Sequence, residues 1–95
     1  MRAVTFHGVS KVSVEELPAP QLVDPTDVVV GVRVAAICGS DLHPYSGRET
    51  GLDLGTVMGH EFLGEVVEVG SAVARWAVGD RVVAPFTTSC GVCWY

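Results

Sequence analysis

Apolar and polar residues alternate along much of the chain, in short runs that are typical of β-strands. The clearest run spans residues 27–37, in which every even position from Val28 to Ala36 is apolar. β-Branched residues dominate this run and Gly31 lies inside it, which disfavours a helix. The run therefore predicts a strand, and Cys38 follows it on the apolar side if the alternation continues.

Shorter runs of the same kind predict further strands over residues 3–7, 12–16, 64–69 and 81–84, separated by turns rich in glycine, proline and aspartate. One short helical turn is expected just before Pro44, with Ser40 or Asp41 as its cap. Short strands with frequent turn signals and almost no helical periodicity predict a mainly β fold, either a barrel or a sandwich.

Composition and charge narrow the class of protein. The chain has 95 residues, 48% hydrophobic and 18% charged, with a formal net charge of −5, which fits one small globular domain. Lysine and arginine form no run, so nucleic acid and anionic membranes are not expected partners. No apolar run approaches the roughly 18 residues of a membrane helix, and the N-terminus lacks the centre of a signal peptide. The three cysteines favour thiols or metal ligands over a disulfide framework, and we predict a cytoplasmic location.

Two metal-binding residue types stand at the ends of strand-like runs. Cys38 ends the longest run and is followed at once by several polar side chains, and His60 comes later beside Glu61. Taken singly, a buried core cysteine and a hydrogen-bonded structural histidine are the commoner interpretations. Together, one thiolate and one imidazole supply two of the three protein ligands of a catalytic zinc site. The third ligand could be Glu61 or could lie outside this chain.

Two other chemistries are excluded by the same stretch. His60 and Glu61 are not followed by the second histidine of a His-Glu-x-x-His metalloprotease helix. The glycines do not match a phosphate-binding loop or the Gly-x-Gly-x-x-Gly pattern of dinucleotide sites. We therefore expect this segment to bind no nucleotide by itself.

A second pair of thiols stands near the end of the sequence. Cys90 and Cys93 have the spacing with which two thiolates hold one tetrahedral metal. The alternatives are two unrelated thiols or a redox pair, and a redox pair normally opens a helix in a βαβ unit, which the pattern does not predict. We favour half of a structural zinc site. The chain stops at Tyr95, inside this motif, and we expect it to be part of a longer protein.

Three motifs in order, Cys38–His43, Gly59–Gly70 and Val78–Val82, resemble the zinc-dependent medium-chain alcohol dehydrogenases, and the resemblance covers essentially the whole chain. It implies an N-terminal GroES-like catalytic domain over residues 1–95, a partly open β-barrel with short helical turns. The resemblance also implies that this domain is incomplete at its C-terminus and that the Rossmann cofactor domain lies beyond the chain.

The resemblance also implies roles for the metal ligands. Cys38 and His60 would be ligands of the catalytic zinc, and the Glu61 carboxylate would lie beside this metal and exchange onto it. Cys90 and Cys93 would be the first two of four cysteines around a structural zinc.

Further roles concern proton transfer. Ser40 would take the proton of the substrate alcohol, and His43 would be a later member of the relay to solvent. Asp41 would accept the second N–H of His60 and so fix its orientation. Some relatives carry a basic residue that touches the cofactor phosphate where this chain has Gly39, so that contact must come from elsewhere.

The implied activity is hydride transfer between an alcohol and NAD or NADP, giving an aldehyde or ketone, with the alcohol oxygen on the catalytic zinc. The partners implied are a small-molecule alcohol, aldehyde or ketone and, for the parent enzyme, further copies of itself. The isolated chain is expected to be inactive. Two alternatives stay open: a stand-alone metal-binding or co-chaperonin-like β module without catalysis, and a zinc-free reductase with the same barrel, for which the cysteine and histidine set would have no use.

Overall fold

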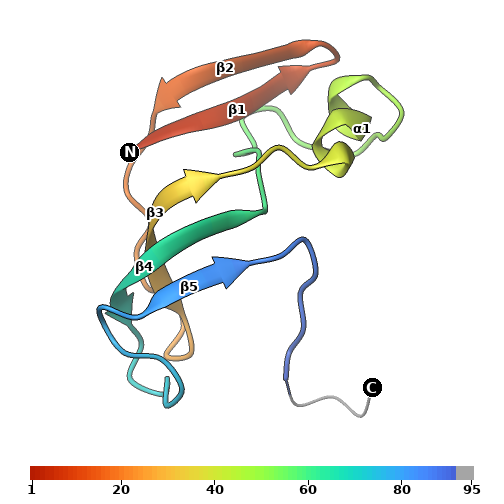
Figure 1. Cartoon of the computed structure of the whole chain (residues 1–95). Helices are drawn as coiled ribbons and strands as arrows, with labels where there is room; N and C mark the ends of the chain where they lie inside the picture. The colour runs from red at the N-terminus through yellow and green to blue at the C-terminus, as the bar shows by residue number, and fades with distance from the viewer. Residues whose placement is uncertain (92–95) are drawn as a thin grey trace.

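The computed structural model describes residues 1–91, which form two antiparallel β-sheets and one short helical segment (Figure 1). The strands are β1 (Arg2–Gly8), β2 (Lys11–Glu16), β3 (Val28–Ala35), β4 (Phe62–Val69) and β5 (Arg81–Ala84). A 3₁₀ turn, η1 (Gly39–Asp41), leads directly into helix α1 (Leu42–Tyr45). One sheet is the β1–β2 hairpin and the other has the order β3-β4-β5. Neither sheet closes on itself, so the expected mainly β, partly open barrel with short helical turns is confirmed.

The β1–β2 hairpin is fastened to the rest of the molecule by the loop that precedes β4. Thr5 forms an isolated antiparallel bridge with Val57, and the Phe6 N–H donates to the Thr56 carbonyl at 2.9 Å. The Met58 N–H donates in the same way to the Val4 carbonyl at 2.8 Å. These backbone bonds continue until two residues before His60. The hairpin therefore holds the loop that carries His60.

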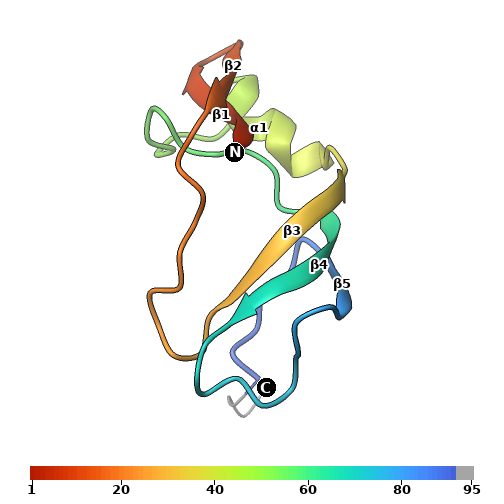
Figure 2. The ribbon, with the colours of Figure 1, turned by 90° about the vertical axis from the view of Figure 1, so that its left-hand side faces the viewer.

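The three-stranded sheet brings the ends of two distant segments together. β3 and β4 run antiparallel, with Ala35 opposite Phe62, so the end of β3 lies beside the start of β4. The Ala36 N–H donates to the Glu61 carbonyl at 3.0 Å, which continues this pairing by one step beyond the strands. Residues that follow β3 and residues that precede β4 are therefore neighbours in space, although a long loop separates them in sequence. Figure 2 shows the same two strand ends turning toward the helical segment.

Two glycines of β4 and its end allow close packing in this sheet. A Cβ at Gly64 would lie 2.5 Å from the Cγ1 of Val30 and 2.7 Å from the Gly31 carbonyl oxygen. A Cβ at Gly70 would collide with the carbonyl of Pro25. A side chain at either position would push neighbouring backbone away, because interiors of this density have no spare volume.

The alternation predicted for residues 27–37 is only partly correct. Strand β3 forms, but irregularities in its pairing with β4 fall between Val29 and Val30 and between Val32 and Val34. Each irregularity interrupts the two-residue period, so the position of Cys38 does not follow from a continuous pleat. Val34 is also 64% exposed, although the pattern places it on the apolar face.

The expected helical turn is present, with two differences from the prediction. Pro44 lies inside α1 and is buried, where the sequence suggested that the turn would end before it. This is possible because Pro44 lies in the first turn of the helix, where its missing N–H has no partner to lose. Asp41 makes no side-chain cap on α1, and its carboxylate instead accepts the Cys38 N–H at 2.9 Å. Within residues 1–91, no helix is long and apolar enough to cross a membrane.

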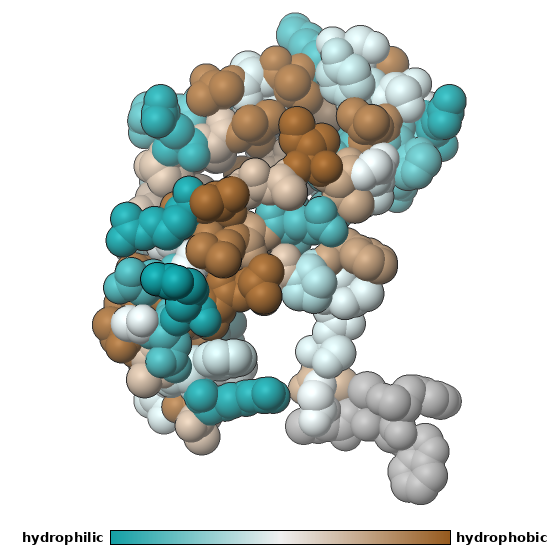
Figure 3. All heavy atoms as spheres, in the orientation of Figure 1, coloured by the Kyte–Doolittle hydropathy of each residue, from teal (hydrophilic) through white to brown (hydrophobic). Residues whose placement is uncertain are grey.

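The outer face of the three-stranded sheet carries exposed apolar side chains. Val34, Leu63 and Val83 come from β3, β4 and β5 and are 64%, 38% and 72% exposed. They line a shallow hollow of about 340 Å³ together with Phe62 and Pro85. Figure 3 shows brown side chains gathered over this part of the molecule. The fully packed centre is small: among the described residues, the buried side chains of the core are those of Phe6, Val66 and the polar Thr5.

Candidate metal centre

Three side chains with metal-binding atoms meet where β3 ends and β4 begins. One ligand atom from each of Cys38, His60 and Glu61 can be chosen so that all three atoms lie within 4.8 Å of one another. Each of the three residues is half-buried, so the cluster lies near the surface and not in the core. Cys38 lies close to His60 because the end of β3 pairs with the start of β4. Three of the sequence-predicted site residues are therefore together.

Asp41 orients the imidazole of His60. The Nδ1 of His60 lies 3.2 Å from the Oδ1 of Asp41, whose side chain is only 13% exposed. The other oxygen of the same carboxylate, Oδ2, accepts the Cys38 N–H. One carboxylate thus ties the backbone of Cys38 to the ring of His60. With Nδ1 held in this way, Nε2 is the nitrogen available to a metal ion.

Ser40 contacts the metal-binding atoms of both Cys38 and His60. Its Oγ donates to the Cys38 sulfur at 3.3 Å and lies 3.1 Å from the Nε2 of His60. The side chain comes from η1, the tight turn that begins immediately after Cys38. The Ser40 hydroxyl therefore contacts both the Cys38 sulfur and the His60 Nε2.

These contacts change the acidity of the two ligands in opposite directions. The pKa of the Cys38 thiol is lowered from its ordinary value of 9.0, chiefly because the Ser40 hydroxyl and N–H and the His60 ring stabilise the thiolate, while burial and the charge of Glu61 oppose this. The pKa of His60 is raised from 6.5, first by its hydrogen bond to Cys38, with further contributions from the negative charges of Asp41, Cys38 and Glu61 and with burial opposing. The arrangement favours a thiolate, which is the form of cysteine that binds metal.

The donor set fits zinc. A thiolate, an imidazole and a carboxylate are the sulfur, nitrogen and oxygen ligands that zinc takes in proteins, and three protein ligands leave the fourth tetrahedral position open. Calcium and magnesium take oxygen ligands and have no use for a thiolate. The open position is the feature that distinguishes catalytic zinc sites from structural ones.

A cavity of about 390 Å³ adjoins the cluster. Ser40, Asp41 and His60 form one part of its wall, and apolar side chains of the following segments form most of the rest: Pro44, Leu52, Val57, Met58 and Phe86. Thr56, Gly59 and Glu49 complete the wall. This volume is in the range of small-molecule sites. Sequence reasoning identified none of the residues in the loop, because they belong to no spacing motif and only the fold brings them to His60.

Three sequence-predicted residues are not part of this cluster. His43 is exposed on α1 and does not line the cavity. Cys90 is exposed in the segment after β5. Cys93 lies outside the described residues. The predicted structural zinc site therefore stays a prediction.

Comparisons with known proteins agree with this geometry. The family model of the alcohol dehydrogenase GroES-like domain matches residues 24–95. Over 95 residues the chain is 57% identical to zinc-type alcohol dehydrogenase B from Aspergillus flavus, covering 100% of this chain and 22% of that protein. It is also 42% identical to the zinc-type alcohol dehydrogenase-like protein AdhB of Bacillus subtilis, of which it covers 25%.

Solved structures show the same fold. The alcohol dehydrogenase TADH from Thermus sp. ATN1 superposes with a TM-score of 0.90 at 48% sequence identity, over 100% of this chain and 27% of that chain. The protein CAD from Helicobacter pylori, complexed with NADP(H), superposes with a TM-score of 0.78 at 26% identity, over 98% of this chain and 27% of that chain. The chain thus spans about a quarter of the length of these relatives.

Proposed function

The chain belongs to the alcohol dehydrogenase GroES-like domain family, and we propose that it is the metal-holding part of an enzyme that transfers hydride between an alcohol and NAD or NADP. The observation that supports this most directly is the convergence of Cys38, His60 and Glu61 within 4.8 Å beside a cavity of small-molecule size. The curated relatives are zinc-type alcohol dehydrogenases, so zinc is the metal that we expect in this cluster.

Cys38 and His60 would hold the ion, with Glu61 or a residue outside this chain as the third protein ligand. When bound there, zinc supplies Lewis acidity, which favours the ionised form of an alcohol hydroxyl. Asp41, whose Oδ1 lies 3.2 Å from Nδ1 of His60, would hold that nitrogen and keep Nε2 available.

We propose that Ser40 receives the proton of the substrate. Its Oγ lies 3.1 Å from Nε2 of His60 and lines the cavity in which an alcohol would bind. We propose that the hydroxyl accepts the alcohol's proton as it passes its own proton outward, and that His43, exposed on the same helical segment, delivers it to water. The apolar part of the cavity wall would pack against the carbon chain of the substrate.

The remaining parts of the enzyme are also proposals. NAD or NADP would bind to a Rossmann domain outside these 95 residues, and a relative crystallised with NADP(H) supports a nicotinamide cofactor. Cys90 and Cys93 would hold half of a structural zinc site. We further propose a small-molecule alcohol, aldehyde or ketone as substrate, a homo-oligomeric parent and a cytoplasmic location. The family match and the converged ligands disfavour a stand-alone β module without catalysis.

The test is removal of the thiol in the full-length protein that contains this chain. We expect Cys38→Ala to lose the catalytic zinc, measured as metal equivalents per subunit, and to lose NAD(P)H production from alcohols. Ser71→Ala, which shortens an exposed side chain that does not line the cavity, should keep both. A Cys38→Ala protein that retained its full zinc content and turnover would refute the ligand role.

A further inference from the structure

One acidic side chain in the cavity wall has no role in the machinery described above. Asp41 and Glu49 both line the cavity. Both oxygens of Asp41 are engaged, one by the Cys38 N–H and one by the His60 ring. For the Glu49 carboxylate, no hydrogen bond or ion pair is formed with any of residues 1–91. Glu49 is exposed and lines the cavity, so its side chain is available as an acceptor to a molecule that enters.

Backbone hydrogen bonds hold Glu49 against the helical segment that carries the proton-transfer residues. The N–H groups of Arg48 and Glu49 both donate to the His43 carbonyl, at 2.9 Å and 3.3 Å. The chain after α1 is thus folded back onto the helical segment formed by η1 and α1. This fold places Glu49 in the wall that Ser40 shares, and the same connection between α1 and β4 contributes Leu52 and Met58. Its position belongs to the site and not to an unrelated part of the surface.

Contact with the Glu49 carboxylate would be unfavourable for an alkyl chain and favourable for a chain that carries a hydroxyl. Packing an alkyl chain against an ionised carboxylate removes water from it and returns no hydrogen bond, which is unfavourable. A hydroxyl on the same chain donates a hydrogen bond to the carboxylate, and bonds to charged acceptors are the stronger kind. A site that is built to pair with a hydroxyl rejects analogues that lack it.

We propose that Glu49 is a specificity-determining residue that selects alcohols carrying a second hydroxyl group, that is diols and polyols, over simple alkyl alcohols. The inference rests on the proposed function, which places the reacting hydroxyl beside Ser40 and His60. The second hydroxyl then reaches Glu49 while the carbon chain lies along Leu52, Met58 and Phe86.

The experiment compares n-butanol with the butanediols in the full-length protein. Steady-state kcat/KM is measured for wild type, Glu49→Gln and Glu49→Leu, and direct binding of the same alcohols is measured by calorimetry. We expect the ratio of diol to n-butanol, in kcat/KM and in affinity, to fall by about tenfold or more in Glu49→Leu. Glu49→Gln, which keeps a neutral acceptor, should fall in between. Asp53→Asn removes an equal charge from an exposed side chain that does not line the cavity, and should leave the ratio unchanged.

Three results would overturn the inference. One is a diol preference that is equal in wild type and Glu49→Leu. Another is a wild type that shows no preference for diols in either binding or turnover. The last is a loss that affects an amino alcohol and not the diols, which would make Glu49 a partner for cations. If wild type turned over no alcohol at all, the proposed function would fail, and the calorimetric ratio would still decide the role of Glu49.

Discussion

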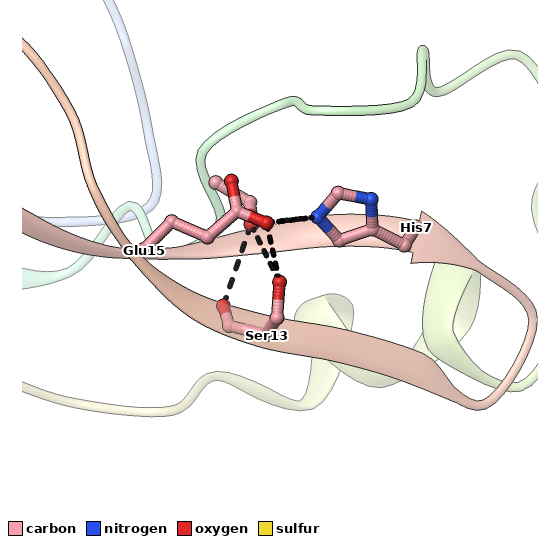
Figure 4. Close-up of polar contacts among 4 residues, drawn as sticks. His7, Ser13 and Glu15 are labelled. Atoms are coloured by element: carbon pink, nitrogen blue, oxygen red, sulfur yellow. Dashed lines mark hydrogen bonds and ion pairs between the residues drawn. The ribbon is translucent and has the colours of Figure 1, made fainter.

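Two histidine–carboxylate pairs in this molecule have the same chemical groups but different surroundings. In the β1–β2 hairpin, Nε2 of His7 lies 2.7 Å from Oε1 of Glu15 (Figure 4). In the candidate metal centre, Nδ1 of His60 lies 3.2 Å from Oδ1 of Asp41. Both histidines are partly exposed, at 31% and 36% of the side chain, so burial does not distinguish them.

In the hairpin pair, both side chains form further hydrogen bonds with residues of β1 and β2. Ser13 Oγ also donates to Oε1 of Glu15 at 2.7 Å, and the fully buried Thr5 contributes its Oγ1, 3.0 Å from the His7 ring nitrogen. Thr5 lies opposite Ser13 in the strand pairing, and His7 and Glu15 are each two positions away on the same face. The strands alone therefore assemble this cluster, and it is a cross-link between them.

The pair in the metal centre is open, because the carboxylate takes the nitrogen nearer the backbone. Asp41 binds Nδ1, so Nε2 points to Ser40 and the Cys38 sulfur. In the hairpin the carboxylate takes Nε2, and no thiol lies near it among the described residues. The two pairs therefore differ in that His60 keeps its outer nitrogen available beside a second strong ligand and His7 does not, which is what a metal site needs.

Removing each imidazole is expected to give the largest difference in zinc affinity between the two pairs. In the full-length protein, His60→Ala should weaken binding of the catalytic zinc by more than about a hundredfold, because a direct ligand is lost and even an indirect partner costs up to that much. His7→Ala should leave zinc affinity unchanged and lower only the thermal stability. Zinc affinity from competition with a chelating dye gives both values. Equal losses of zinc in the two variants would contradict the comparison.

The contact between Asp41 and His60 was implied in advance by the family resemblance, and that between His7 and Glu15 was not predicted. Cys38 and His60 come together because β3 and β4 pair in antiparallel fashion, although a long loop separates them in sequence. His7 and Glu15 carry no motif, although their two-residue spacing from Thr5 and Ser13 would have placed all four on one hairpin face. The cavity residue Glu49 was not predicted, because its position depends on how a loop without regular structure folds back onto α1. The broken alternation in β3 was missed for a related reason, since bulges depend on strand pairing and not on composition.

An intermediate effect is expected from making each carboxylate neutral. Asp41 uses one oxygen for His60 and the other for the Cys38 N–H, so Asp41→Asn must turn an amide NH₂ toward one of these donors. We expect zinc affinity to fall by about tenfold to a hundredfold. Glu15 receives both of its short hydrogen bonds on the single atom Oε1, so Glu15→Gln can keep both with its carbonyl oxygen. The same dye competition should find Glu15→Gln equal to wild type, and an Asp41→Asn protein with unchanged zinc affinity would show that His60 needs no such partner.

The smallest effect is the pH dependence of the hairpin cluster. The pKa of Glu15 is lowered from 4.5, chiefly by the Ser13 hydrogen bond and then by the hydrogen bond and charge of His7, while partial desolvation opposes this. Because the folded pKa lies below the unfolded one, the stabilisation is complete above 4.5 and is lost as the pH falls through the lowered value. Urea unfolding of wild type and Glu15→Gln should therefore differ slightly well above 4.5 and converge well below it. The Glu15 side chain is 39% exposed, so solvent screens its charge and the difference should be small beside the loss of zinc caused by His60→Ala. A gap between the two proteins that persisted or widened in acid would mean that the cluster does not depend on the ionised carboxylate, and the contrast with Asp41 would have to rest on geometry alone.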